Sequence, residues 1–175
     1  MHRIRAAEPH DLGAIQALHR TAFGDAEGPV IADLVARLSA DPSAAPVHSW
    51  VATDEGTVLG HVLFTATRIE AQPARRTAIL CPLAVAPERH KTGIGSALVE
   101  HGLGALADDG VDPVFVLGDP GYYGRFGFSA DHRVSAPYPL PYPEAWQVRS
   151  LAGTSLADLN GSLRCADALE APELW

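Results

Sequence analysis

Hydrophobic and polar positions recur along the first forty residues with periods that predict a strand followed by two helices. Residues 2–6 alternate and predict a strand. Two amphipathic helices follow, the first beginning near Pro9 and the second after a break at Gly28-Pro29. Their apolar positions are Leu12, Ile15, Leu18, Ala22 and Phe23 in the first helix, and Ile31, Leu34, Val35 and Leu38 in the second.

The next segments predict a hairpin and a buried strand. Residues 47–53 and 58–69 read as strands joined by a turn at Asp54-Glu55-Gly56. Residues 77–85 are apolar at nearly every position, which is typical of a central strand covered on both faces. Pro82 lies inside this run and has no N–H to donate, so it predicts a bulge or a place where strand pairing fails.

The second half of the chain alternates between helix and short strands. The apolar pattern predicts a helix over 93–109, a buried strand over 114–117 and a turn with a short helix over 119–126. Extended structure is expected from Phe128, with one more strand at 146–151 and an irregular tail. This order predicts an α/β or α+β fold in which helices flank a mixed sheet.

Composition bounds the class of protein. A chain of 175 residues, with 47% hydrophobic and 19% charged residues, fits one soluble domain spanning 1–175. The longest apolar run, 78–87, is too short to span a bilayer, and the N-terminus lacks a signal-peptide core, so no membrane partner and a cytoplasmic location are expected. A net charge of −8 disfavours nucleic acid and is compatible with amine-bearing partners or with solubility alone. The two cysteines do not indicate a disulfide scaffold.

A glycine-containing loop between a buried strand and a helix is the main candidate binding element. Residues 83–85 end the strand, and Gly93 and Gly95 stand at the start of the helix. Glycines let a ligand approach the backbone, and the free N–H groups of a helix start suit a pyrophosphate. Lys91 adds positive charge at this position. The alternative is an ordinary helix start with two loop glycines and no ligand.

Two other phosphate-binding loops fit this segment badly. A Walker loop ends in Gly-Lys-Ser/Thr, whereas Lys91-Thr92 precedes Gly93 here. A Rossmann fingerprint has a third Gly or Ala where Leu98 stands, and its glycines follow the strand directly. Asp119, after the next strand, is the one feature that keeps a nucleotide-dependent oxidoreductase as an alternative.

Two motifs resemble the GNAT superfamily of N-acetyltransferases. The run His90-Lys91-Thr92-Gly93-Ile94-Gly95 is similar to its Gln/Arg-x-x-Gly-x-Gly/Ala motif, with His90 in place of the usual first residue. Tyr123 precedes Gly127-Phe128 by four residues, as in the family's second signature. The Leu-Gly-Asp-Pro form at 117–120 and the segment 143–148 resemble a bacterial branch of predicted N-acetyltransferases. The resemblance as a whole covers about residues 4–161.

The resemblance implies a mixed, mostly antiparallel sheet flanked by helices, in which strands 77–85 and 114–118 are parallel and splay apart. The core would span about 2–135, with a C-terminal strand and tail over 136–175. Acetyl-CoA would be the co-substrate, lying between the splayed strands. The implied cofactor-binding residues are Leu83, Ala84, Val85, His90, Lys91, Thr92, Gly93, Ile94, Gly95, Ser96, Gly118, Asp119, Tyr122 and Phe126.

The resemblance also implies a reaction and an acid. Tyr123 would protonate the departing thiolate as general acid while a primary amine, on a small molecule or peptide, takes the acetyl group. A packing aromatic is the alternative for Tyr123. A non-catalytic CoA-sensing or partner-binding module with the same fold is the alternative for the whole protein, since no general base is identified.

The remaining chemistry-bearing residues point to structural roles. Glu27 is placed between the first two helices, where the family builds its acceptor site, and reads as a solvated acid. Cys81 has apolar neighbours that raise a thiol pKa, which favours packing over nucleophilic chemistry. Ser96 lacks a nucleophile-elbow frame, and the eight histidines show no metal-ligand spacing, so no metal is expected. An exposed aromatic and proline segment is a candidate wall of the acceptor site, a homodimer surface, or a stiff connection: Tyr138, Pro139, Pro141, Tyr142 and Trp146.

Overall fold

The computed structural model describes residues 2–175. The strands are β1 (Arg3–Ala6), β2 (His48–Asp54), β3 (Thr57–Ile69), β4 (Thr77–Val85), β5 (Val114–Leu117), β6 (Arg133–Ser135), β7 (Trp146–Arg149) and β8 (Asn160–Arg164). The helices are α1 (Leu12–Ala40), α2 (Ile94–Asp108) and α3 (Pro120–Tyr123). Short 3₁₀ turns link several of them.

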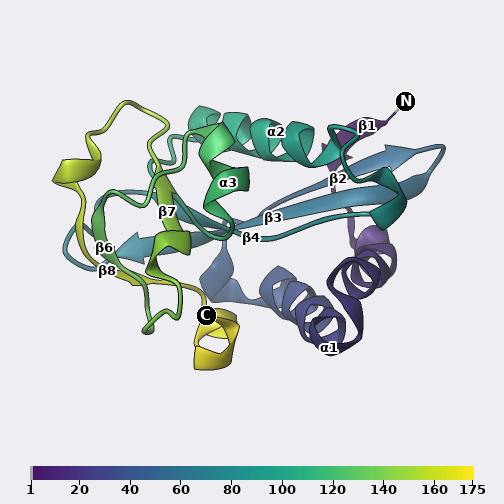
Figure 1. Ribbon diagram of the computed structural model, residues 1–175, viewed down its shortest axis with the longest axis horizontal. Coiled ribbons are helices and arrows are strands. Elements are labelled where there is room, and N and C mark those ends of the chain that lie inside the picture. Colours follow the sequence, from purple (N-terminus) through teal and green to yellow (C-terminus); the bar gives the residue numbers. More distant parts are fainter. Residues whose placement is uncertain (1) are drawn as a thin grey trace.

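The sheet forms the middle layer of the molecule, with α2 on one face and α1 on the other (Figure 1). Its strand order is β1-β2-β3-β4-β5-β7, and β8 pairs with the end of β3 and with β6. The pairs β4–β5 and β6–β8 are parallel, and the other pairs are antiparallel. The expected layered fold with a mixed, mostly antiparallel sheet is confirmed.

The β2–β3 hairpin forms where the turn residues predict it. Glu55 and Gly56 both have positive φ, at 47° and 83°, which is the backbone that a two-residue hairpin turn with the right-handed strand twist requires. The hairpin aligns β3 between β2 and β4, and so places the longest strand of the protein at the centre of the sheet.

Two buried clusters hold the layers together. Phe64, Leu98 and Val116 belong to the cluster between α2 and the sheet. Leu38, Leu63 and Phe115 belong to the cluster on the opposite face, which the C-terminal segment also covers. Each cluster combines residues from both halves of the sequence, so the domain has one continuous sheet with a hydrophobic layer on each side.

Helix α2 lies unusually close to the sheet at two glycines. A Cβ on Gly60 of β3 would lie 2.8 Å from side-chain atoms of both Ile94 and Leu98. A Cβ on Gly102 would lie 2.2 Å from Cε2 of Phe64. Because real Cβ atoms do not approach this closely, both positions have to be glycine for α2 to rest where it does.

The break between the first two helical segments differs from the expectation. It lies at Gly24, whose φ of 79° and ψ of −178° are not helical, and Pro29 lies within the second segment. Gly28 has a different role, because a Cβ there would lie 2.5 Å from the carbonyl oxygen of Arg20. The absence of a side chain at Gly28 therefore lets the two segments cross closely, and the predicted break at Gly28-Pro29 is wrong by about one turn.

The C-terminal region is more ordered than the expected irregular tail. Strand β8 pairs Arg164 with Arg68 and Leu163 with Ile69 at the end of β3. Trp146, expected to be exposed, has only 5% of its surface accessible, and its indole N–H donates to the Val134 carbonyl at 2.9 Å. Of that aromatic segment, Tyr142 is exposed at 67%.

Candidate functional site

Strands β4 and β5 pair over only three residues and then separate. Ala78, Ile79 and Leu80 are opposite Val114, Phe115 and Val116 in parallel register. Beyond Leu80 the β3–β4 register shifts, so that Cys81 and Pro82 lie opposite the single residue Leu63. The bulge expected at Pro82 is confirmed in the β3–β4 pairing. The expected failure of pairing is confirmed on the other side of β4, where the pairing with β5 stops. The result is a fork between β4 and β5.

The last residues of β4 direct backbone groups into this fork. The Ala86 N–H donates to the Leu59 carbonyl at 2.8 Å, and the same register pairs Ala84 with His61. Because alternate residues of an antiparallel strand point their polar groups in opposite directions, Leu83 and Val85 point theirs away from β3. The Val85 carbonyl accepts a 3.0 Å hydrogen bond from His90 Nε2, which agrees with that direction.

The loop after β4 ends in a cradle at the start of α2. Lys91 and Gly93 both have positive φ, at 62° and 89°, and Gly93 caps the helix. The next amides, those of Ile94, Gly95 and Ser96, belong to the first turn, where N–H groups have no partner within the helix. Ile94 can contribute only its backbone, because its side chain is 2% exposed and packs in the core.

Tyr122 and Arg125 border this cradle. The Tyr122 hydroxyl oxygen lies 2.6 Å from where a Cβ on Gly95 would be, so only glycine permits the contact. The Arg125 guanidinium carbon lies 4.7 Å from the centre of the Tyr122 ring, and its Nη2 lies 3.4 Å from Ser96 Oγ. Arg125 therefore places a positive charge beside the first turn of α2. It was absent from the predicted site, although its position three residues after Tyr122 on a short helix was a usable signal.

Tyr123 lies at the fork, against the end of β5. A Cβ on Gly118 would lie 2.4 Å from the Tyr123 ring, so Gly118 is the residue that admits the ring. Burial raises the pKa of Tyr123 above its ordinary value, and the neighbouring Tyr122 and Cys81 act in the same direction. The phenol therefore carries its proton at neutral pH, and burial makes it a weaker acid than an ordinary tyrosine.

Cys81 lines a small cavity at the fork, on the face opposite α2. The cavity measures about 70 Å³ and is bounded by Ile79, Leu117, Leu174 and Trp175, among others. Burial raises the pKa of the Cys81 thiol to about 11, which leaves it protonated and unreactive at neutral pH. The C-terminal residues at this cavity were not predicted, because the tail gave no pattern of its own.

Two further candidate residues have evident structural partners, and a third, Glu27, does not lie in the element expected for it. Asp119 accepts a 2.9 Å hydrogen bond from the Gly121 N–H and so caps α3. Phe126 is 7% exposed, and its ring packs edge-on against Tyr122 at 5.4 Å. Glu27, expected in a loop, lies within α1 after the Gly24 kink and is exposed.

Residues 2–175 contain no helix that is long and apolar enough to cross a membrane. Over the same residues, no three His, Cys, Asp or Glu side chains gather as a metal site would need.

Comparison with known proteins gives concordant matches over most of the chain. The model of the acetyltransferase (GNAT) domain matches residues 3–130. The uncharacterized N-acetyltransferase YjhQ of Escherichia coli is 38% identical over 170 residues, covering 94% of this chain and 92% of its own. The crystal structure of E. coli YhbS with CoA has a TM-score of 0.87 at 31% identity, covering 97% of this chain and 92% of its own. A Brucella melitensis GNAT acetyltransferase bound to acetyl-CoA has a TM-score of 0.78 at 29% identity, with coverages of 96% and 97%.

Proposed function

The chain belongs to the GNAT family of acetyltransferases, and from this we propose that it transfers an acetyl group from acetyl-CoA to a primary amine, with Tyr123 as the general acid. The observation that carries the proposal is the fork between β4 and β5, with free amides on one arm and a protonated phenol on the other. The cofactor rests on the relatives, since the E. coli and B. melitensis structures hold CoA and acetyl-CoA.

We assign the pyrophosphate of acetyl-CoA to the cradle at the start of α2. The first-turn amides of Ile94, Gly95 and Ser96 supply hydrogen-bond donors, and the helix dipole favours negative charge there. Gly95 admits the Tyr122 hydroxyl close to these amides, because a Cβ there would lie 2.6 Å from it. Lys91, within the loop, and Arg125, beside Ser96, add positive charge near these amides.

The pantetheine arm fits between β4 and β5, where it would act as a surrogate strand. Leu83 and Val85 offer N–H and C=O groups toward the fork, whereas those of Ala84 face β3. His90 already donates to the Val85 carbonyl, so the arm either uses the second lone pair of that oxygen or displaces the histidine. Because the backbone polar groups of Ala84 face β3, the cofactor can contact Ala84 only through the alanine side chain.

The proposed reaction is direct transfer. Acetyl-CoA supplies an acetyl thioester, and the neutral amine forms the new N–C bond as the C–S bond breaks. A strand amide at the fork stabilises the negative charge that develops on the carbonyl oxygen. Tyr123 gives its proton to the departing sulfur and regains one from solvent, while the amine loses its proton to water. Burial keeps Tyr123 protonated but also makes it a weaker acid, so transfer of its proton relies on the phenol lying beside the departing sulfur.

Tyr123→Phe tests the assignment of the acid. The ring still packs against Gly118 and Phe128, so acetyl-CoA affinity should stay nearly unchanged while turnover falls about a hundredfold, the low end for a general acid with a good leaving group. The measurement is thiol release over a panel of primary amines.

Tyr122→Phe is the matched control, because its hydroxyl faces Gly95 rather than the end of β5. Full turnover by Tyr123→Phe on a confirmed substrate would show that another group supplies the proton. If the unmodified protein binds CoA but acetylates no amine in a broad panel, a CoA-sensing module becomes the better account.

A further inference from the structure

A chain of three buried or partly buried side chains lies outside the fork. His61 on β3 and His19 on α1 are both 0% exposed, and His61 Nδ1 is 2.9 Å from His19 Nε2. On its other side His61 Nε2 is 2.9 Å from Ser49 Oγ on β2. None of the three belongs to the residues assigned to acetyl-CoA.

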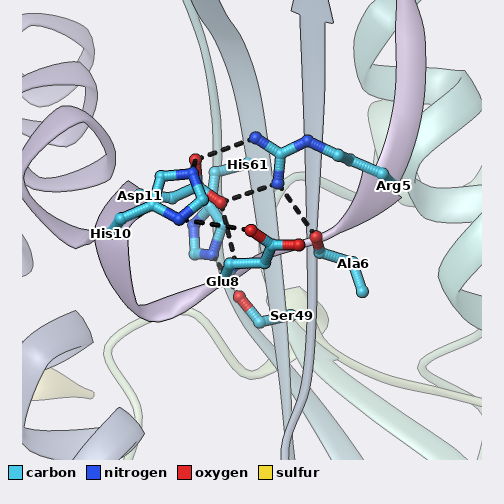
Figure 2. A network of polar contacts seen from close by, with 7 residues as sticks. All are labelled: Arg5, Ala6, Glu8, His10, Asp11, Ser49 and His61. Carbon is cyan, nitrogen blue, oxygen red and sulfur yellow. Dashed lines mark hydrogen bonds and ion pairs between the residues drawn. The ribbon is translucent and has the colours of Figure 1, made fainter.

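Ser49 and His61 form part of the wall of a cavity of about 520 Å³ between α1 and the β1–β2 edge of the sheet. This volume is within the range of small-molecule sites. The rest of the wall is mostly apolar and includes Leu12, Ile15 and Val35, with Glu8 as the one carboxylate. Figure 2 shows Ser49 and His61 on neighbouring strands, with Glu8 and the Arg5–Asp11 ion pair beside them.

The hydrogen-bond chain has two possible directions. If Ser49 donates to His61 and His61 to His19, the Nδ1–H of His19 is a buried donor, and that atom has no partner. If His19 donates to His61 and His61 to Ser49, only a lone pair of His19 is left without a partner. Orphaned buried N–H groups are the rarer defect in native proteins, so we assign the second direction. It leaves the Ser49 hydroxyl proton free to donate into the cavity.

The same geometry resembles a nucleophilic serine with two histidines behind it, but the chemistry opposes that use. Burial lowers the pKa of His61 to about 3 and that of His19 to about 4, so His61 is too weak a base to activate Ser49 at neutral pH. The third member is a neutral imidazole, which stabilises a charged His61 less than a carboxylate does. Binding is therefore the role that the arrangement supports.

We propose that this cavity is a second ligand site, which takes a small neutral molecule with an apolar body and a carbonyl-type oxygen that accepts a hydrogen bond from Ser49. The apolar wall provides most of the buried contact, and the Ser49 hydroxyl fixes the orientation. The Glu8 carboxylate at the same cavity disfavours anionic ligands.

A pair of probes of nearly equal size tests the proposal. The ¹⁵N-labelled full chain is titrated with acetophenone and, separately, with ethylbenzene, which lacks the carbonyl. We expect amide shifts confined to the cavity wall around residues 6–12, 35–40 and 47–50, with tighter binding of acetophenone. Ser49→Ala should weaken acetophenone about fivefold, the effect of one neutral hydrogen bond, and leave ethylbenzene unchanged. Benzoate should not bind.

Two further variants keep the test decisive. Ser39→Ala is the control, because Ser39 lines the cavity but its hydroxyl already donates to the Val35 carbonyl at 2.7 Å. Ala36→Phe fills the cavity from α1 and should abolish binding of both probes. Equal affinities for the two probes, an equal loss of both in Ser49→Ala, or shifts outside the cavity would overturn the proposal. Covalent labelling of Ser49 by a fluorophosphonate would overturn it in favour of a nucleophilic serine.

Discussion

The buried pair His19–His61 should make the stability of the protein fall steeply in mild acid. Burial lowers the pKa of both imidazoles from the ordinary value of 6.5, to about 4 for His19 and about 3 for His61. The neighbouring Asp11 carboxylate acts in the opposite direction on His61 but does not cancel the effect of burial. In the unfolded chain both take up protons as the pH falls through about 6.5, whereas the folded protein does not.

The sign and size of this effect follow from proton linkage. A lowered folded-state pKa for a histidine means full stability above pH about 6.5 and a progressive loss below it, because the unfolded state binds more protons. Each histidine contributes a slope that rises toward about 1.4 kcal/mol per pH unit, so the pair together removes about 3 kcal/mol between pH 6.5 and pH 5. This is a large part of the roughly 5–15 kcal/mol that stabilises a typical domain.

Urea unfolding at a series of pH values between 7.5 and 5 measures the slope. The double variant His19→Gln/His61→Gln has amides in place of the imidazoles and should lose most of the pH dependence, even if its stability at pH 7 is lower. His10→Gln is the control, since the His10 side chain is 69% exposed. Asp11, with its pKa lowered to about 2 by Arg5, does not titrate in this window. An unchanged slope in the double variant would refute the reasoning.

Two substitutions at the cradle should separate its backbone from its charge. Gly95→Val places side-chain atoms against the Tyr122 hydroxyl and the phosphate position, so the rise in Tm that CoA produces should vanish while the variant stays folded by circular dichroism. Arg125→Ala should weaken CoA about three- to tenfold by calorimetry and reduce the salt dependence of binding, because an exposed cation contributes modestly. No effect of Arg125→Ala at low salt would remove Arg125 from the proposed site.

The local sequence pattern was sufficient to predict the elements that form the fork between β4 and β5 and the cradle at the start of α2. The run 77–85 is apolar on both faces, and a proline within it cannot pair, so β4 and its bulge followed from the residues alone. The loop glycines Gly93 and Gly95 likewise marked the start of α2. Such a pattern does not show whether a ligand binds at the start of α2. The match to the acetyltransferase family is the observation that indicates a ligand.

Long-range contacts account for what the sequence did not predict. Strand β8 is polar and contains Gly161, and it exists because it pairs with β3 nearly a hundred residues earlier. The helix break was placed at Gly28-Pro29 because a Gly-Pro pair is the stronger local signal, whereas the crossing against Arg20 determines the role of Gly28. His19, Ser49 and His61 come from three separate elements, and no spacing rule joins them.

The close contact between Gly102 and Phe64 couples the packing of α2 on the sheet to the position of the first turn of the helix. Gly102 rests on Phe64 eight residues after Ile94, about 12 Å along the axis from the first-turn amides. Even a single methyl group at Gly102 would tilt or lift the helix. The first-turn amides would then be displaced, although no ligand contact and no charge had been changed. Differences in cofactor affinity among relatives can therefore originate in the packing beneath this helix, where an inspection of contact residues would find nothing altered.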